Sequence, residues 1–243
     1  MSAPGQCRTV VVFPPVTVAR DFIDYPYVGN LGAVQLAAVL DSPIVDAFAL
    51  PRSTLTWRDD GRAHLGASVD EVLAALTALG PIDTAVVAYT PFHRPPHRDD
   101  VLAAVLAGLK SDSIGVKRVI LADCHQSGQH YVEVPGEAVL ASYPEVDAWV
   151  KYEAEVTVPR LLEEFVPGVH RGESPSLETL PLPAWHRVDL DHYAAFHRRF
   201  VEKLGRSGWS FPIGGRTLPV VTSRGCPFTC THCSSHPERL PGE

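Results

Sequence analysis

Short apolar runs alternate with helix-like segments over residues 9–165 of this chain. The runs are rich in β-branched residues and lack polar alternation, which is typical of strands buried on both faces of a parallel sheet. Strand and helix alternating through short links predict an open parallel α/β sheet with right-handed crossovers. The predicted strands are 9–13, 44–50, 84–89, 117–122 and 146–151, and the predicted helices are 31–40, 69–79, 101–110, 137–143 and 156–165.

Local signals support the second and third of these helices. Ser68 and Glu71 form a capping box at the start of the 69–79 helix. Asp99 and Asp100 place negative charge at the start of the 101–110 helix, where the helix dipole favours it. A further amphipathic helix is predicted at 191–204.

Ligands of such sheets bind at the carboxyl ends of the strands, where the strand order reverses. The loops expected at this edge are 14–30, 90–98, 124–131 and 152–155. No G-x-G-x-x-G sequence follows the first strand, so a dinucleotide is not indicated.

Two polar stretches are predicted to be surface loops. Residues 57–66 are polar and indicate an exposed loop. His93 and His97 are four residues apart, but Pro95 and Pro96 prevent the helix that would place both on one face. We therefore expect a solvated loop there rather than a metal site.

Composition restricts the function classes. A chain of 243 residues with 45% hydrophobic content can bury one full domain and part of another. The net charge of −7 argues against a general nucleic-acid binder, and no apolar run approaches the ~18 residues of a membrane span. Cys7 and Cys124 are isolated and no signal-peptide organisation is present. The sequence predicts a cytoplasmic protein.

Three of the five cysteines form the sequence Cys226-x3-Cys230-x2-Cys233. Three thiolates so close together can bind one soft metal centre. Iron–sulfur clusters are normally held by four cysteines, so three would leave one iron open to a substrate or cofactor. Two alternatives remain open at this point: a structural zinc site completed by His236, and a disulfide with a spare thiol.

The spacing and the surrounding residues, SRGCPF and HCSS, resemble the C-x3-C-x-Φ-C signature of the radical S-adenosylmethionine (radical SAM) enzymes. The resemblance implies a [4Fe–4S] cluster held by Cys226, Cys230 and Cys233. Its open iron would bind S-adenosylmethionine (SAM), and reduction would cleave SAM to a 5′-deoxyadenosyl radical. His232 occupies the Φ position, usually an aromatic residue, and the resemblance places His232 and Phe228 at SAM.

The upstream α/β unit resembles the cobalamin-binding domain of cobalamin-dependent radical SAM enzymes. Phe13-Pro14-Pro15, the helix 31–40 and the segment 146–155 carry the resemblance; the last is similar to VDxVVxGEGE. Tyr152 and Ala154 stand where that pattern has Gly, which would allow a tight turn or a close approach to a ligand. The resemblance implies a five-stranded, flavodoxin-like (Rossmann-like) domain at 1–170, a linker at 171–215 and the start of a radical SAM barrel at 216–243.

Residues 123–128 fit D-x-H-x-x-G, the pattern by which other cobalamin proteins supply a histidine to cobalt. There the pattern follows the first strand, whereas here it follows the fourth, where the resembled family commonly reads GGxH. We therefore expect contacts to the corrin or nucleotide tail; His125 as a lower cobalt ligand and an ordinary polar loop stay open. The predicted cobalamin contacts are Pro14, Pro15, Thr90, Asp123, His125, Ser127, Gly128 and Glu153.

The resemblance implies radical methyl transfer to an unactivated carbon or phosphorus, or a related rearrangement. A small-molecule or peptide substrate and an electron donor such as flavodoxin or ferredoxin are the expected partners. A full barrel takes about 250 residues, so we expect the leading part of a longer enzyme or the product of a shortened reading frame. Two alternatives are a cobalamin- or other ligand-binding module without catalysis, and an interaction protein with a zinc-stapled tail.

Overall fold

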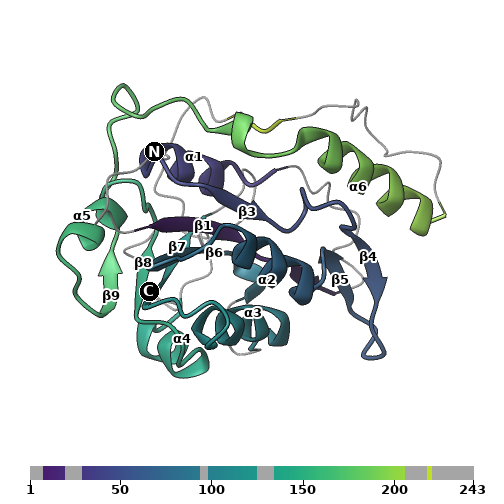
Figure 1. Cartoon of the computed structure of the whole chain (residues 1–243), viewed down its shortest axis with the longest axis horizontal. Coiled ribbons are helices and arrows are strands. Elements are labelled where there is room, and N and C mark those ends of the chain that lie inside the picture. Colours follow the sequence, from purple (N-terminus) through teal and green to yellow (C-terminus); the bar gives the residue numbers. More distant parts are fainter. Residues whose placement is uncertain (1–7, 20–28, 94–97, 125–133, 206–217, 221–243) are drawn as a thin grey trace, which may run out of the picture.

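The computed structural model describes residues 8–19, 29–93, 98–124, 134–205 and 218–220. Within these residues, six parallel strands form the main sheet in the spatial order β3-β1-β6-β7-β8-β9 (Figure 1). The strands are β1 (Thr9–Phe13), β3 (Ile44–Asp46), β6 (Thr84–Tyr89), β7 (Arg118–Asp123), β8 (Ala148–Lys151) and β9 (Gly168–Arg171).

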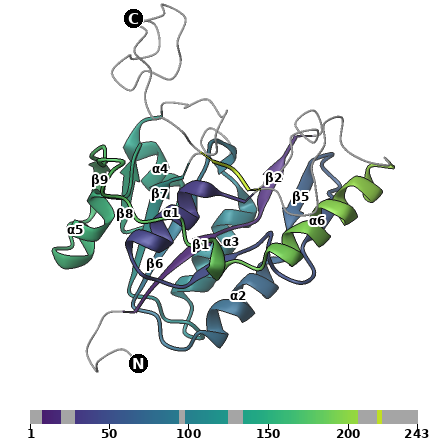
Figure 2. The same cartoon turned by 90° about the horizontal axis from the view of Figure 1, so that it is seen from above.

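Helices cover both faces of this sheet (Figures 1 and 2). The predicted alternation of strand and helix is confirmed, and the chain is an α/β protein compatible with a Rossmann-like fold. One face carries α1, whereas α2, α3 and α4 lie on the other (Figure 1). The crossover helices are α1 (Leu31–Val39), α2 (Val69–Ala78), α3 (Asp100–Lys110), α4 (Gly136–Ser142) and α5 (Thr157–Glu163).

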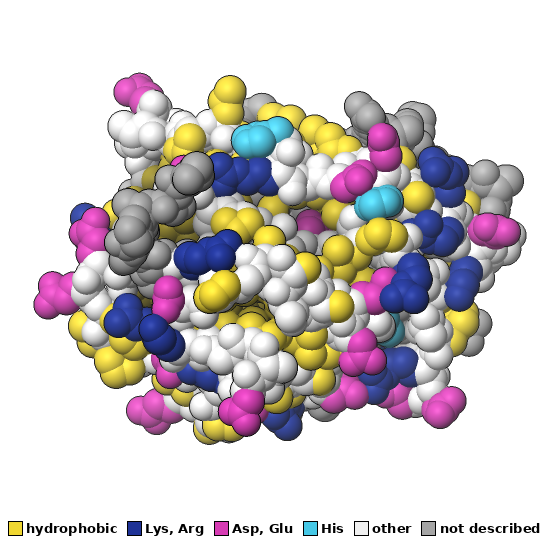
Figure 3. Space-filling view, viewed as in Figure 1, with side chains coloured by type: hydrophobic (Ala, Val, Ile, Leu, Met, Phe, Trp, Pro, Cys, Tyr) yellow, Lys and Arg dark blue, Asp and Glu magenta, His cyan; other side chains and the backbone are white. Residues whose placement is uncertain are grey.

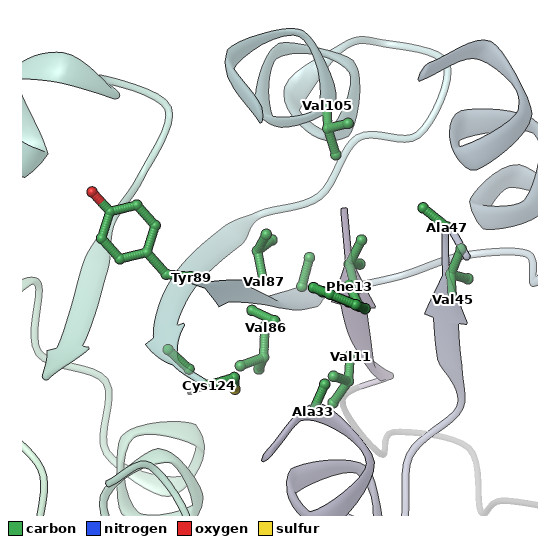
Figure 4. Packing of buried hydrophobic residues seen from close by; sticks show 14 of the residues in the cluster. Val11, Phe13, Ala33, Val45, Ala47, Val86, Val87, Tyr89, Val105 and Cys124 are labelled. Carbon is green, nitrogen blue, oxygen red and sulfur yellow. The ribbon is translucent and has the colours of Figure 1, made fainter. Parts of the chain in front are cut away.

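The central strands are buried on both faces, as continuous apolar runs predict. All six residues of β6 are buried. Val86 points to the α1 side of the sheet, toward Ala33, whereas Val87 points to the α3 side, toward Val105 (Figure 4). Full burial of one such side chain contributes about 1.5–3 kcal/mol, so this core supplies much of the stability.

The predicted helix starts are confirmed in detail. Ser68 Oγ accepts a hydrogen bond from the Glu71 N–H at 3.3 Å, and Glu71 Oε2 accepts one from the Ser68 N–H at 3.3 Å. Asp99 caps α3 by accepting from the Leu102 N–H at 2.7 Å. These side chains satisfy amide groups that the first helical turn leaves without partners.

The sheet has one strand more than the five that the sequence predicted. The additional strand, β9, pairs with β8, and the Gly172 N–H donates to the Lys151 carbonyl oxygen at 2.8 Å. β9 has only four residues, and one side chain in two is exposed. A segment of four residues is too short to show an apolar run in the sequence. β9 is a strand because it pairs with β8, not because of its own β propensity.

A second, three-stranded antiparallel sheet corrects the prediction of an exposed loop at 57–66. Its order is β2-β5-β4, with β2 (Val16–Val18), β4 (Thr54–Trp57) and β5 (Ala63–Gly66). β4 and β5 form a hairpin whose turn contains Asp60-Gly61, a dipeptide typical of hairpin turns that the sequence reading had missed. β2 lies within the predicted 14–30 loop. The predicted strand 44–50 is too long: β3 ends at Asp46, and residues 47–50 form a turn followed by a bend.

The predicted helix at 191–204 is confirmed as α6 (Leu190–Lys203). α6 packs beside β4, and the Arg199 guanidinium donates to the carbonyl oxygen of Ser53, directly before β4, at 2.6 and 2.9 Å. The preceding segment packs on α1: Gln35 Nε2 donates to the Pro181 carbonyl oxygen at 2.8 Å. The predicted domain boundaries, after residue 170 and after residue 215, stay predictions. Residues 181–203, which the sequence assigned to a linker, contact the domain that contains the main sheet.

Acidic and basic side chains are interspersed on the face seen in Figure 3. Arg52 and Glu71 form one surface ion pair, with Arg52 Nε 2.8 Å from Glu71 Oε1. No helix within the described part of the chain has the length and apolar character needed to cross a membrane.

Gly172 gives a test of the β8–β9 pairing. A β-carbon at this position would overlap the carbonyl oxygens of Glu153 and Lys151. We expect Gly172→Ala to lower the free energy of unfolding by about 1–3 kcal/mol, because the backbone of β9 must move away from β8. Urea unfolding measures the loss, with Ser174→Ala, at an exposed position nearby, as the control. Equal midpoints for Gly172→Ala and wild type would contradict this account.

Candidate cofactor-binding site

The strand order reverses at β1, which has β3 on one side and β6 on the other. If only the strands of the main sheet are counted in chain order, their spatial order is 2-1-3-4-5-6. The first five follow the flavodoxin-like order 2-1-3-4-5, and the sixth, β9, is added beside β8. In open α/β sheets this switch point, at the carboxyl ends of the strands, is where ligands bind. The candidate site is therefore the edge formed by the ends of β1, β6, β7 and β8 (Figure 2).

The predicted contact residues after β1 and β6 are buried at this edge. Pro14 and Pro15 lead directly from β1 into β2. Thr90 follows β6, and both its N–H and its Oγ1 lie 3.2 Å from His93 Nδ1. Because the Thr90 N–H must donate, Nδ1 is an acceptor, which assigns the proton of the neutral imidazole to Nε2.

His93 is fully buried, so the prediction of a solvated residue is wrong. Its ring stacks on Tyr89 at a centroid distance of 5.9 Å, and Tyr89 also contacts Trp149 at 5.6 Å. The short 3-10 helix that carries it, Pro91–His93, is fixed by Tyr143 Oη, which donates to the His93 carbonyl oxygen at 2.7 Å. The turn is therefore buried because His93 packs on Tyr89 of β6, which in turn packs on Trp149 of β8, and because Tyr143 after α4 binds its backbone.

Tyr143 remains a neutral donor in this cluster. Burial raises the pKa of Tyr143 to about 12. Its hydroxyl also accepts from the Asp99 N–H at 3.0 Å, so it joins the N-cap of α3 to the turn after β6. One phenol consequently holds the connection between β6 and α3 near both of its ends.

Asp123, predicted to contact cobalamin, joins two strands. Its Oδ1 accepts from Trp149 Nε1 at 2.9 Å, and its Oδ2 accepts from the Tyr152 N–H at 2.9 Å. The residue is only 4% exposed. Asp123 therefore fixes the loop after β8, which includes the half-buried Glu153, against the end of β7. Contact of Asp123 or Glu153 with a cofactor stays a prediction.

Tyr152 adopts a left-handed backbone conformation, with φ of 71°. It stands where the resembled pattern has Gly, and the conformation costs a non-glycine residue about 1–2 kcal/mol. The bond to Asp123 offsets part of this cost, as do Lys151 Nζ at 5.2 Å and Arg171 Cζ at 5.3 Å from the Tyr152 ring. The loop after β8 therefore keeps a glycine-type backbone without glycine.

Asn30 fixes the amino end of α1 at the same edge. Its Oδ1 caps the helix by accepting from the Ala33 N–H at 3.0 Å. Its Nδ2 donates to the Cys124 carbonyl oxygen at 3.1 Å, directly after β7. The close approach needs Gly32, because a β-carbon there would lie 3.2 Å from Cys124. An asparagine just before a predicted helix is an N-cap signal that the sequence reading did not use.

Asp46, at the end of β3, is a buried acid among aromatic rings. Tyr193 Oη donates to its Oδ2 at 2.7 Å, and the Phe48 N–H donates to its Oδ1 at 2.9 Å. Burial nevertheless raises the pKa of Asp46 to about 6. Burial and then the Asp46 carboxylate raise the pKa of Tyr193 well above its usual value. A lone acid inside an apolar run was the only sequence signal for this pair.

Several predicted site residues lie outside the described residues. They are Cys226, Cys230, Cys233, Phe228 and His232 in the cysteine segment, and His125, Ser127 and Gly128 in the loop after β7. Their assignments stay predictions. The described ranges contain no group of three histidine, cysteine or acidic side chains that could hold a metal ion.

The sheet topology provides an edge at which a large ligand could bind, whereas the described polar side chains at this edge are hydrogen-bonded to the protein itself. The parallel strands β1, β6, β7 and β8 end at one edge of the sheet, the usual position of ligands in such folds. The polar atoms of Thr90 and Asp123, however, are bonded to His93, Trp149 and Tyr152. A separate pocket of about 750 Å³, between the turn at 50–52 and the start of α2, contains none of the predicted site residues.

Comparison with family models, with curated proteins and with solved structures finds no match for this chain.

Asp46→Asn tests the buried acid. The pKa of Asp46 is raised in the fold, so between pH 4 and 6 the folded state binds more protons than the unfolded state. Its contribution is fully present below the unfolded value of 3.8 and is lost as the pH rises through about 6. We expect the unfolding free energy of wild type, relative to Asp46→Asn, to fall by about 3 kcal/mol over this window.

Urea unfolding at a series of pH values measures this difference. Asp112→Asn, at an exposed position, serves as the control and should run parallel to wild type. A constant offset between Asp46→Asn and wild type from pH 4 to 7 would refute the assignment of Asp46.

The left-handed backbone of Tyr152 is tested by a pair of substitutions. Tyr152→Ala and Tyr152→Gly both remove the ring and its cation contacts, so their difference reports the backbone alone. We expect Tyr152→Gly to be more stable than Tyr152→Ala by about 1 kcal/mol, because glycine adopts positive φ without a steric cost. Thermal or urea unfolding of both variants gives the difference, and a more stable alanine variant would show that φ is negative there.

Proposed function

We propose that this chain supplies the cobalamin-binding domain and the cluster-binding segment of a cobalamin-dependent radical SAM enzyme. One observation carries the proposal: a parallel α/β sheet with a flavodoxin-like switch point precedes the sequence Cys226-x3-Cys230-x2-Cys233. The sheet offers the edge at which a large cofactor binds, and the cysteines offer three thiolates to one iron–sulfur cluster.

The cysteine segment supports a [4Fe–4S] cluster with an open iron. Cys226, Cys230 and Cys233 would hold three irons and leave the fourth for SAM, with His232 and Phe228 beside it. When bound, the cluster and cobalamin would supply one-electron reduction of SAM and transfer of a methyl group to the substrate. A flavodoxin- or ferredoxin-type protein is the proposed source of the electron, and a small molecule or peptide the substrate.

The sheet domain would place cobalamin at the ends of β1, β6, β7 and β8. Pro14, Pro15 and Thr90 line the β1 and β6 side of this edge, and His125, Ser127 and Gly128 belong to the loop after β7. Asp123 acts on the β8 side by fixing the backbone N–H of Tyr152, so its role there is to position the loop that continues to Glu153. The chain's residues thus orient the cofactor and exclude water, and the cofactors carry the reaction.

Anaerobic reconstitution with iron and sulfide tests the cluster. We expect the wild-type chain to hold about four irons and four acid-labile sulfides. Cys226→Ala removes one thiolate and should reduce iron loading at least tenfold, whereas Cys7→Ala, outside the trio, should leave it unchanged. Stoichiometric zinc without sulfide would instead establish a structural zinc tail, and unchanged iron in Cys226→Ala would refute the ligand assignment.

Uptake of hydroxocobalamin tests the sheet domain separately. We expect the chain to retain the coloured cofactor through gel filtration at a ratio near one per chain, with a visible spectrum shifted from that of the free form. Nicotinamide and flavin cofactors serve as controls, since the fold class alone admits them. Retention of a flavin in preference to hydroxocobalamin would contradict the proposed ligand.

A further inference from the structure

A buried chain of hydrogen bonds links the carboxyl end of β7 to that of β3. Asn30 Nδ2 donates to the Cys124 carbonyl oxygen at 3.1 Å. The phenol of Tyr193 lies at the same place: a β-carbon at Gly29, directly before Asn30, would be 3.6 Å from Tyr193 Cζ, and the Asn30 backbone N–H acts as a hydrogen-bond donor that lowers the pKa of Tyr193 against the larger effect of burial. Tyr193 Oη in turn donates to Asp46 Oδ2 at 2.7 Å. β3 and β7 flank β1 and β6, so this chain of bonds runs along the switch point of the sheet.

Every member of the chain is withdrawn from solvent. The exposed fractions are 0% for Asn30, 2% for Cys124, 3% for Asp46 and 7% for Tyr193. Buried hydrogen bonds of this kind are costly to break, because each group left behind keeps its desolvation cost without a partner. A change at one end therefore affects the position of the others.

Tyr193 is the one member that α6 contributes. The other buried side chains of α6 are apolar: Phe196 contacts Phe48 at 5.2 Å and Phe200 packs on Phe196 at 5.7 Å. Arg199 binds the Ser53 carbonyl oxygen. These contacts attach α6 to the region after β3, whereas the Tyr193 hydroxyl reaches the amino end of α1.

We propose that Tyr193 is a positioning residue that couples docking of α6 to the geometry of the amino end of α1 at the β1/β6 edge. Two sites coupled in this way favour each other reciprocally. A ligand that needs α1 in place strengthens the docking of α6, and docked α6 strengthens ligand binding. Identifying that ligand as cobalamin rests on the proposed function; the coupling between the two helices does not.

The coupling has a consequence for the cysteine segment. In sequence, α6 is the described helix that directly precedes Cys226, Cys230 and Cys233. By this order in the sequence, docking of α6 would fix one end of the segment that leads to the proposed cluster ligands.

Hydrogen exchange of the ligand-free chain tests the coupling. Tyr193→Phe keeps the ring against Phe48 and removes only the hydroxyl. Phe200→Leu loosens α6 without touching the hydrogen-bond chain and is the matched control. We expect exchange in α1, at Ala33 to Ala37, to rise at least tenfold in Tyr193→Phe. In Phe200→Leu the exchange rate of α1 should rise less than twofold, after correction for any change in global stability. We expect α6 itself to exchange faster in both variants.

Unchanged exchange of α1 in Tyr193→Phe, or an equal rise in both variants, would overturn the proposal. If Tyr193→Phe does not fold, Asp46→Asn breaks the same chain of bonds one step further on. The amide introduced by that substitution has a single acceptor oxygen, which cannot replace both carboxylate oxygens that accept from Tyr193 and from the Phe48 N–H. The same pattern is expected, with α1 affected more than in Phe200→Leu.

Titration with hydroxocobalamin tests the ligand side of the coupling. We expect the dissociation constant to rise at least fivefold in Tyr193→Phe and less than twofold in Phe200→Leu. Equal affinities of wild type and Tyr193→Phe would overturn the link between α6 and the ligand edge. If wild type does not bind hydroxocobalamin, the proposed function loses its ligand, while hydrogen exchange of α1 still decides the coupling between the helices.

Discussion

Pairing of buried polar groups sets the geometry of the described part of the carboxyl edge. Asp123 holds the backbone after β8, Tyr143 holds the turn after β6, and Asn30 holds the start of α1 against the end of β7. Each of these side chains lies where a lost hydrogen bond would leave a desolvated group behind. The edge is therefore preorganised by the protein's own contacts.

The main sheet could be predicted because its strands are continuous apolar runs, and burial on both faces requires such runs. β9 could not, since its four residues alternate in exposure and owe their conformation to β8. The β4–β5 hairpin contains Asp60-Gly61, but the polar residues around this turn concealed the apolar faces of both strands. The pattern of apolar residues along the sequence therefore identified strands whose side chains are mostly apolar. It missed strands such as β9, whose conformation depends on pairing with a neighbouring strand.

The candidate site was only partly predictable for a related reason. The resemblance pointed to Asp123 and to the loop at Tyr152, and the structure shows the hydrogen bond between them. Nothing in the sequence indicated that Tyr193, in a segment expected to follow a linker, would bond to Asp46 at the end of β3. Contacts between residues so distant along the chain leave no periodic pattern. His93 was misjudged because its burial depends on Tyr89 and Tyr143, two aromatic residues on other elements.

We propose that a cluster with one open iron follows this sheet domain. Electron paramagnetic resonance of the reconstituted, reduced chain, recorded with and without SAM, tests it most directly. We expect a reduced [4Fe–4S] signal whose g-values shift when SAM is added, because the open iron gains ligands. A signal that SAM leaves unchanged, or no cluster signal beside stoichiometric zinc, would contradict it.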